Sequence, residues 1–395
     1  MKYNHSFSAA NILLPKENIE SWATVACDQY TSEPEYWDEV KKVAGDKPSA
    51  LNIILPEVYL SADNTGRINS INQTMQEYLQ SNIFNEYNDA LIYVERIQSD
   101  GKCRRGIVGK IDLENYDYHS GTDAEIRATE QTVLSRIPPR VEIRKNAPLE
   151  MPHVMLLFDD IEDTIFSYLN TNKENFEKVY DFTLMCNAGS IKGYLLNAEA
   201  KQFVLETFHQ LKEQKDGFLF CVGDGNHSLA TAKECYNLNK TDASRYALTE
   251  VVNIHDTALE FEPIYRVVFG VDPQVLLDKF VNTLGEGAQK FTCVYEDKEI
   301  TISVNPTAKL SVGTLQAFLD DYVKSYPDAE IDYIHGENSL KKLASRKNAI
   351  GFIFDGMQKS ELFEAVNQDG SLPRKTFSMG HADDKRFYIE ARKIK

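Results

Sequence analysis

The chain has 395 residues, of which 42% are hydrophobic, and its 60 acidic residues outnumber 43 basic ones to give a net charge of −17. This length predicts two or three domains, and the apolar fraction indicates a packed globular protein rather than a disordered one. The acidic balance argues against a nucleic-acid partner, because such binding relies on Lys and Arg to neutralise phosphates. A small anionic ligand stays possible, since the field inside a pocket can differ from the global charge.

The cysteines and the apolar runs predict a cytoplasmic location. The six cysteines form no Cys-x-x-Cys pair, which argues against a zinc site or a disulfide framework. The apolar stretch 9–14 is short and is interrupted by Asn11, so it is not typical of a signal peptide. No run of about eighteen apolar residues occurs, so we expect no transmembrane helix and no membrane partner.

Strand and helix patterns alternate through the first half of the chain. The runs 92–97 and 106–113 are separated by a Ser-Asp-Gly turn and predict a β-hairpin. A short apolar strand is predicted at 154–158, and His153 before it is interpreted as a capping or packing residue. Asn197 predicts the start of an amphipathic helix, because its side chain can cap the first turn.

One polar segment combines arginines with an acid. Arg127, Arg136 and Arg140 lie within fourteen residues of sequence, and Glu130 lies between them. Arginine forks suit phosphate or carboxylate recognition, and Glu130 could bind a metal or act as a base. The alternative is a solvated helix face on which these charges pair with one another.

The most informative segment is 218–236. The apolar run 218–222 predicts a buried strand, and Gly223-Asp224-Gly225-Asn226 predicts a tight turn, because Gly, Asn and Asp tolerate left-handed backbone angles. Residues 229–236 are rich in helix formers, and Ser228 is interpreted as the N-cap of that helix. The segment is therefore a strand, a glycine-rich turn and a helix N-terminus.

Such a turn directs backbone N–H groups and the positive end of a helix dipole toward one point, which favours an anion. The segment is not a Walker A loop, because no Gly-Lys-Ser/Thr follows, and Ser228 stands where a dinucleotide-binding Gly-x-Gly-x-x-Gly has its third glycine. The alternative interpretation is a simple connection between a strand and a helix.

Hairpins mixed with helices continue toward the C-terminus. A second hairpin is predicted within 291–304, an amphipathic helix over 315–323 and a strand over 350–354. This pattern favours an α+β fold with mixed, largely antiparallel sheets. We expect a main α+β region over 1–270 that contains the glycine-rich loop, and a C-terminal α+β region over 271–395.

At these residues the sequence resembles a bacterial family known only as domain of unknown function 1015. The hallmark of that family is Ala-Asp-Gly-His-His-Arg followed by Tyr-x-Thr-Ala, and the similarity extends over almost the whole chain. The residues that carry it are Gly223-Asp224-Gly225-Asn226-His227-Ser228, Leu229-Ala230-Thr231-Ala232, Ala26-Cys27-Asp28-Gln29-Tyr30-Thr31, Glu130 with Thr132, Pro152-His153 and Leu372-Pro373-Arg374-Lys375-Thr376-Phe377.

The hallmark in turn looks like that of the ParB/sulfiredoxin-like superfamily. There a similar loop and helix N-terminus bind nucleotide phosphates, and one branch is a free-serine kinase. The resemblance implies a ParB/sulfiredoxin-like core around 218–236. This chain departs from the motif at Asn226, which replaces a His, and at Ser228, which replaces an Arg. A hydroxyl does not replace the bidentate fork of arginine, so the departure weakens phosphate recognition.

The leading interpretation is a nucleotide-dependent, kinase-like phosphotransferase acting on a small metabolite, such as an amino acid or a hydroxy acid. Phosphoryl transfer mainly requires positioned phosphates and neutralised charge. We expect Mg²⁺ and a nucleotide, ATP or ADP, as cofactors. The expected catalytic residues are Asp224, which would also bind the metal, His227 and Glu130. The expected phosphate- and nucleotide-binding residues are Gly223, Gly225, Asn226, Ser228 and Arg127.

Two other classes of function stay open. A non-catalytic sensor or scaffold could bind a nucleotide or a metabolite at the same loop. A nuclease follows from the superfamily analogy alone, and the net charge of −17 and the absence of a basic stripe argue against it.

Overall fold

The computed structural model describes residues 6–61, 63–151 and 153–395, so Pro152 of the Pro152-His153 motif lies outside the described residues. The chain forms two compact units. The first contains 1–128, 132–259 and 380–395, and the second contains 129–131 and 260–379. These limits differ from the boundary expected near residue 270. The first unit ends at residue 259, and the last sixteen residues of the chain belong to it again. Both units mix helices with mainly antiparallel sheets, which confirms the α+β class.

The first unit is built around a ten-stranded mixed sheet with the order β11-β12-β5-β6-β14-β10-β13-β8-β7, in which β1 also pairs with β6. Its strands are β1 (Phe7–Ser8), β5 (Ile92–Ile97), β6 (Cys103–Asp112), β7 (Tyr116–Asp117), β8 (Ile126–Ala128), β10 (Met155–Phe158), β11 (Glu177–Thr183), β12 (Ser190–Leu195), β13 (Phe220–Asp224) and β14 (Tyr246–Asn253). Three two-stranded sheets flank it: β2 (Ala10–Pro15) with β4 (Phe84–Ala90), β3 (Thr24–Val25) with β21 (Phe387–Tyr388), and β9 (Leu149–Glu150) with β22 (Arg392–Lys393).

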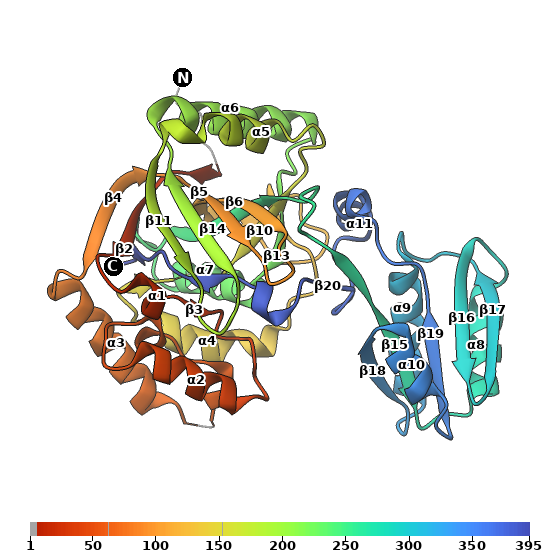
Figure 1. Ribbon diagram of the computed structural model, residues 1–395. Helices are drawn as coiled ribbons and strands as arrows, with labels where there is room; N and C mark the ends of the chain where they lie inside the picture. The colour runs from red at the N-terminus through yellow and green to blue at the C-terminus, as the bar shows by residue number, and fades with distance from the viewer. Residues whose placement is uncertain (1–5, 62, 152) are drawn as a thin grey trace. The chain divides into compact units, whose positions relative to one another are not determined.

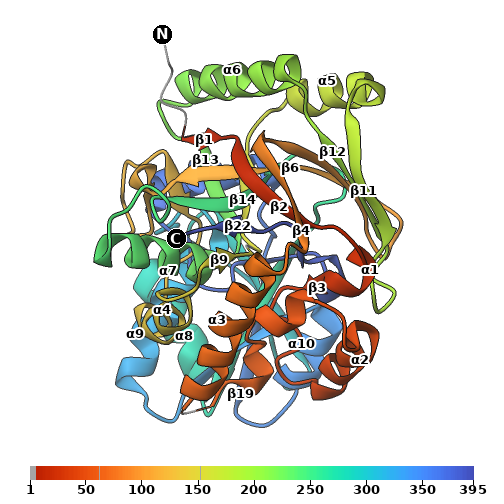
Figure 2. The ribbon, with the colours of Figure 1, turned by 90° about the vertical axis from the view of Figure 1, so that its left-hand side faces the viewer.

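Helices cover this sheet on both sides, and Figures 1 and 2 show α5 and α6 together on the side opposite α2, α3 and α4. The helices are α1 (Ile19–Trp22), α2 (Pro34–Ala44), α3 (Thr65–Gln80), α4 (Ile137–Arg144), α5 (Thr164–Asn172), α6 (Ala198–Gln214) and α7 (Asn226–Leu238). Among the helices of the described residues, none combines the length and the apolar character needed to span a bilayer.

Alternation along the strands divides the apolar residues between the two faces of the sheet. Tyr93 and Ile107 belong to the cluster that includes α5 and α6, whereas Ile92 and Val108 belong to the cluster that includes Trp37 of α2. Successive side chains of a strand point to opposite faces, so each strand contributes to both cores.

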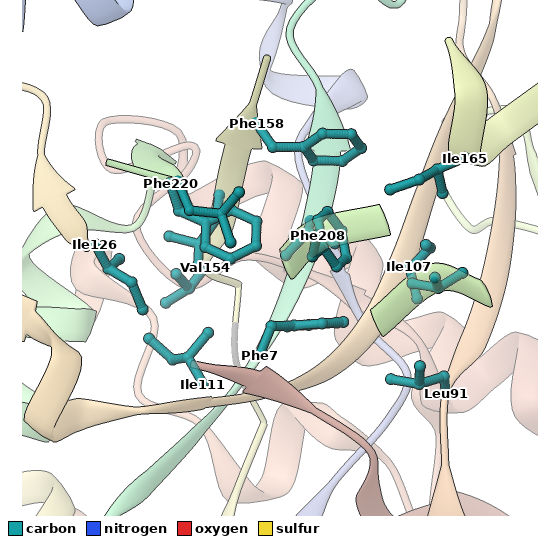
Figure 3. Packing of buried hydrophobic residues seen from close by; sticks show 14 of the residues in the cluster. Phe7, Leu91, Ile107, Ile111, Ile126, Val154, Phe158, Ile165, Phe208 and Phe220 are labelled. Atoms are coloured by element: carbon teal, nitrogen blue, oxygen red, sulfur yellow. The ribbon is translucent and has the colours of Figure 1, made fainter. Parts of the chain in front are cut away.

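Aromatic rings fill the core beneath α6. Figure 3 shows Phe208 of α6 among Phe7, Phe158 and Phe220, which come from three different strands. The ring centroids of Phe208 lie 5.5, 5.0 and 5.3 Å from those of Phe7, Phe158 and Phe220, with edge-to-face geometry. Such pairs add about 0.5–1.5 kcal/mol each to the free energy of burial, and they fix α6 and β13 in one arrangement.

Several elements of the first unit confirm the sequence prediction. β5 and β6 form the expected antiparallel hairpin, and β10 matches the strand predicted at 154–158. Asn197 caps α6, because its side chain accepts a hydrogen bond from Ala200 N at 2.9 Å. The strand predicted at 218–222 is observed two residues later, as β13.

The second unit contains a six-stranded sheet with the order β17-β16-β19-β15-β18, and β20 pairs with one end of β15. Its strands are β15 (Phe261–Phe269), β16 (Gln289–Tyr295), β17 (Lys298–Val304), β18 (Glu330–His335), β19 (Ala349–Ile353) and β20 (Phe377–Met379), and its helices are α8 (Pro273–Leu284), α9 (Ser311–Ser325), α10 (Glu337–Ala344) and α11 (Leu362–Asp369). The predicted hairpin, helix and strand are confirmed as β16–β17, α9 and β19.

The C-terminal segment 380–395 is buried within the first unit. Arg386, only 2% exposed, forms ion pairs with Glu250 of β14 and with Glu390, whose side chain lies 2.5 Å away. Glu390 also accepts a hydrogen bond from Tyr180 of β11 at 2.6 Å. These contacts join the segment to two strands of the large sheet.

Replacing Arg386 by Met should destabilise the first unit by about 3–5 kcal/mol, because it leaves Glu250 and Glu390 buried without their cation. Both tryptophans, Trp22 and Trp37, are fully buried in this unit, so tryptophan fluorescence during urea unfolding reports on it specifically.

The matched control is Lys393→Met in the same segment, because Lys393 pairs with Glu86 at 2.7 Å on the surface. Such exposed pairs contribute at most about 1 kcal/mol. Equal losses of stability in the two variants would contradict the role assigned to Arg386.

Candidate functional site

The loop between β13 and α7 has the geometry that the sequence predicts, with one correction. β13 ends at Asp224, and Gly225 takes a left-handed conformation with φ of 80°. An added Cβ at Gly225 would lie 3.0 Å from Val154 Cα, so both the backbone angle and the close approach require glycine. The interpretation of Ser228 as the N-cap is wrong, because α7 begins at Asn226 and Gly225 occupies the N-cap position.

The first turn of α7 therefore faces the end of β13. The hydrogen-bond ladder of the helix starts with Leu229 N, which donates to Gly225 O at 3.0 Å. The N–H groups of His227 and Ser228 precede that ladder and lie at the positive end of the helix dipole. This arrangement favours an anion near the loop.

Asp224 is held by a cation from the C-terminal segment. Its Oδ1 atom accepts a hydrogen bond from Gly225 N at 2.9 Å, and its Oδ2 atom lies 3.2 Å from Lys385 Nζ. Both side chains are 18% exposed, so they stay accessible to a small ligand. The loop thus presents a carboxylate and an ammonium group side by side.

His227 is neutral at neutral pH. Burial, together with the positive charges of Arg140 and Arg136, lowers its pKa to about 4. Its Nε2 atom accepts a hydrogen bond from Val133 N at 3.3 Å, which requires the unprotonated nitrogen. A role of His227 as a general acid would require a pKa near neutral pH, and the pKa of about 4 lies well below that.

Arg136 and Arg140 bring positive charge to the loop from α4 and the turn before it. Arg140 donates to Arg136 O at 3.0 Å and forms an ion pair with Glu57, and both guanidinium groups act electrostatically on His227. The neighbouring Asn226 donates to Thr132 Oγ1 at 3.1 Å, which ties the loop to the segment that leads into α4.

The structure places Arg127 at the other end of β13. Arg127 pairs with Cys221, and its guanidinium stacks over the ring of Phe218 at 4.0 Å while Nε donates to Ala124 O at 2.8 Å. Phe218 precedes β13 and Asp224 ends it, so the head group extends away from the glycine-rich loop.

Glu130 belongs to the second unit. Its two carboxylate oxygens accept hydrogen bonds from Lys375 N and Thr376 N, each at 3.1 Å, and the residue forms a parallel bridge with Leu372. These contacts connect Glu130 to the motif at 372–377, and a catalytic role for Glu130 stays a prediction.

A buried network that the sequence did not predict lies beside the loop. His153 Nε2 lies 3.2 Å from Ser228 Oγ and 3.7 Å from Asp28 Oδ2, and its Nδ1 lies 2.8 Å from the Tyr388 hydroxyl. Burial raises the pKa of Asp28, but attraction to the protonated form of His153 and a hydrogen bond from Gln29 outweigh it and leave that pKa lowered.

Asp28 and His153 lie in segments quoted for the family resemblance, so that signal could have placed them in the site. The sequence carried no comparable signal for Lys385 or Tyr388, because they reach the site only through the fold.

The side chains at the loop could hold Mg²⁺ only if a bound ligand supplied further oxygen atoms to the ion. Over the described ranges, no group of three or more His, Cys, Asp or Glu side chains is arranged to hold a metal ion. Mg²⁺ commonly uses one or two carboxylates and completes its coordination with substrate phosphates and water. Asp224 can supply one carboxylate of this kind.

The family model that matches the chain is described as "Protein of unknown function (DUF1015)" and covers residues 8–393. The chain belongs to this family. No curated protein matches it. The expected family is therefore confirmed over nearly the full length, and the motif residues described above are those of a family member.

Solved structures with some likeness have low sequence identity. A free serine kinase mutant in complex with ADP has a TM-score of 0.42 at 11% identity, and the match covers 72% of this chain and 91% of the kinase. A conserved hypothetical protein from Pyrococcus furiosus has a TM-score of 0.37 at 12% identity, with 72% and 94% coverage. SbnI from Staphylococcus aureus, truncated at its C-terminus, has a TM-score of 0.39 at 10% identity, with 71% and 85% coverage.

The neutral state of His227 predicts a specific pH dependence. Its pKa is about 4 in the folded protein against 6.5 for an unperturbed His, so the unfolded chain binds the proton more tightly. The contribution of neutral His227 to the free energy of unfolding is fully present above about pH 6.5, and it is lost as the pH falls toward 4.

The measurement is urea unfolding followed by tryptophan fluorescence at several pH values, for wild type and His227→Gln. The wild type should lose more stability than the variant between pH 7 and pH 5. Parallel pH profiles would contradict the lowered pKa.

Proposed function

We propose that this protein is a nucleotide-dependent phosphotransferase that acts on a small hydroxyl-bearing metabolite, such as an amino acid or a hydroxy acid. The observation that carries the proposal is the convergence at one loop of a helix N-terminus, the Asp224–Lys385 pair and the charges of Arg136 and Arg140. Phosphoryl transfer needs this combination of positioned donors and positive charge more than covalent help from the protein.

Backbone groups and cations would bind the phosphates of ATP or ADP. The N–H groups of Gly225 to Ser228, together with the side chain of Asn226, would contact the phosphate oxygens, and the tight turn at Gly223 would let them approach. Arg136 and Arg140 would add positive charge from α4. Arg127 would position β8 and the segment before β13 rather than touch the ligand.

Asp224 would serve the acceptor hydroxyl or the metal. Its carboxylate is accessible and can accept the proton of a substrate hydroxyl or bind Mg²⁺, which would neutralise phosphate charge when bound. Lys385 can then turn from Asp224 to the phosphate, because the 3.2 Å pair is formed between two partly exposed groups. Neutral His227 would orient the ligand by donating a hydrogen bond from Nδ1, because its Nε2 already accepts one from Val133 N.

The second candidate is a sensor that binds a nucleotide or a metabolite without turnover. It is favoured by Asn226 and Ser228, whose side chains contact Thr132 and His153 instead of extending a charged group into the loop. Under either function the partner is a small molecule, and a cytoplasmic location stays a prediction.

Nucleotide binding should be visible as thermal stabilisation. Saturation at about a hundred times Kd stabilises the native state by roughly 2.7 kcal/mol, which shifts Tm by several degrees in a chain of this size. The measurement is a thermal-shift screen over ATP, ADP, AMP and inorganic phosphate, each with and without Mg²⁺. Absence of a shift with any nucleotide would reject this function.

Asp224→Asn separates the enzyme from the sensor. The variant keeps the shape of the side chain and removes its charge, so kcat for nucleotide turnover should fall by about 10²-fold or more while Kd changes little. The matched control is Asp242→Asn, an exposed residue beyond the other end of α7, which should keep wild-type turnover. A binding protein without measurable turnover would favour the sensor.

A further inference from the structure

Ser228 and His153 form a hydroxyl–imidazole pair that the proposed function does not use. Ser228 is the third residue of α7, and its Oγ atom lies 3.2 Å from His153 Nε2. A serine hydroxyl becomes a nucleophile when a neighbouring base can take its proton, and a contact of about this length is the usual sign of such a pair. Ser228 is half-buried, and His153 is 6% exposed.

The surroundings of His153 favour the tautomer that this role requires. The Tyr388 hydroxyl accepts a hydrogen bond from Cys27 N at 3.2 Å. Burial is the main reason why the pKa of the Cys27 thiol is raised to about 12, and a hydrogen bond with Tyr388 acts in the opposite direction. The Tyr388 oxygen has two lone pairs, so it can also accept a hydrogen bond from His153 Nδ1, 2.8 Å away, when that nitrogen carries the ring proton. His153 Nε2 is then the unprotonated nitrogen and faces Ser228.

Asp28 supports the second half of a proton transfer. Its Oδ2 atom lies 3.7 Å from the same His153 Nε2, and its carboxylate is charged. A proton that moves from Ser228 to His153 would create an imidazolium beside this carboxylate, which stabilises it. Asp28 is a positioning residue in this scheme because it does not contact the serine oxygen.

We propose that Ser228 is a site of self-phosphorylation, with His153 as the general base. The inference rests on the proposed function, since it needs a nucleotide at the loop. Ser228 Oγ attacks the terminal phosphorus of the nucleotide and an O–P bond forms. The bond from that phosphorus to its bridging oxygen breaks, the nucleotide leaves one phosphate shorter, and the serine proton passes to His153 Nε2.

The site can also hold the product. A phosphate on Ser228 would lie in the first turn of α7, where the helix dipole favours negative charge, and near cations that already act on the loop. The same features that would bind a nucleotide phosphate therefore stabilise the modified serine.

The test is incubation of the full chain with ATP or ADP and Mg²⁺, followed by intact mass measurement and mapping of the modified peptide. We expect one phosphoryl group on Ser228, stable in acid as a phosphoserine is. Ser228→Ala should abolish it, and Ser228→Thr, which keeps a hydroxyl, should retain part of it. Ser70→Ala, an exposed serine on α3, is the matched control and should be modified like the wild type.

His153→Gln tests the base. The rate of modification should fall by about 10²-fold or more, while the thermal shift caused by nucleotide stays close to that of the wild type. Nucleotide binding without phosphate on Ser228, or an acid-labile phosphate on a histidine, would overturn this inference and leave the proposed function standing. Absence of any nucleotide-induced shift would overturn both.

Discussion

The buried ion pairs of Arg386 are the constraint on which the candidate site depends. A guanidinium between Glu250 and Glu390 commits the segment 380–395 to the interior of the first unit, because none of these charges can be left buried alone. The neighbours of Arg386 in sequence are the residues that reach the loop. Lys385 contacts Asp224, and Tyr388 contacts His153. The last residues of the chain thus complete a site whose loop lies more than a hundred and fifty residues earlier.

The site gathers several cations in a protein whose net charge is negative. The chain carries a net charge of −17, yet Lys385, Arg136 and Arg140 gather around one helix N-terminus. Burial lowers the pKa of His227, and the two guanidinium groups of Arg140 and Arg136 lower it as well, so the imidazole resists protonation. An anionic ligand could replace Asp224 or Glu57 as the partner of these cations, which is the physical reason for proposing phosphate there.

The loop also combines two ways of holding a ligand that differ in rigidity. Gly225 is fixed by its left-handed angle and by the approach of Val154, so the backbone donors are set before any ligand arrives. Asp224 and Lys385 are partly exposed and can exchange partners. A rigid backbone cradle with adjustable charged side chains suits chemistry in which charge moves during the reaction.

The sequence by itself determined the local elements. The turn at Gly223-Asp224-Gly225-Asn226, the hairpins β5–β6 and β16–β17, the cap at Asn197 and the α+β class all follow from short-range patterns, because turn and cap preferences act over a few residues. Family membership followed from motifs in the correct order. The exact start of α7 did not follow, because Gly225 took the cap position that Ser228 could also have filled.

Only the tertiary structure decided which of these residues meet. Arg127 was expected at the loop because it carries suitable chemistry, but its head group extends toward Phe218. Glu130 binds the backbone of Lys375 and Thr376 within the second unit, and its role at the loop stays a prediction. His153 and Tyr388 were not expected there, and they lie against Ser228 and Cys27 because strand pairing and the buried C-terminal segment bring them in. Contacts between residues far apart in sequence depend on how the sheet is ordered and which charges are buried together, and a single sequence contains no short-range pattern for either.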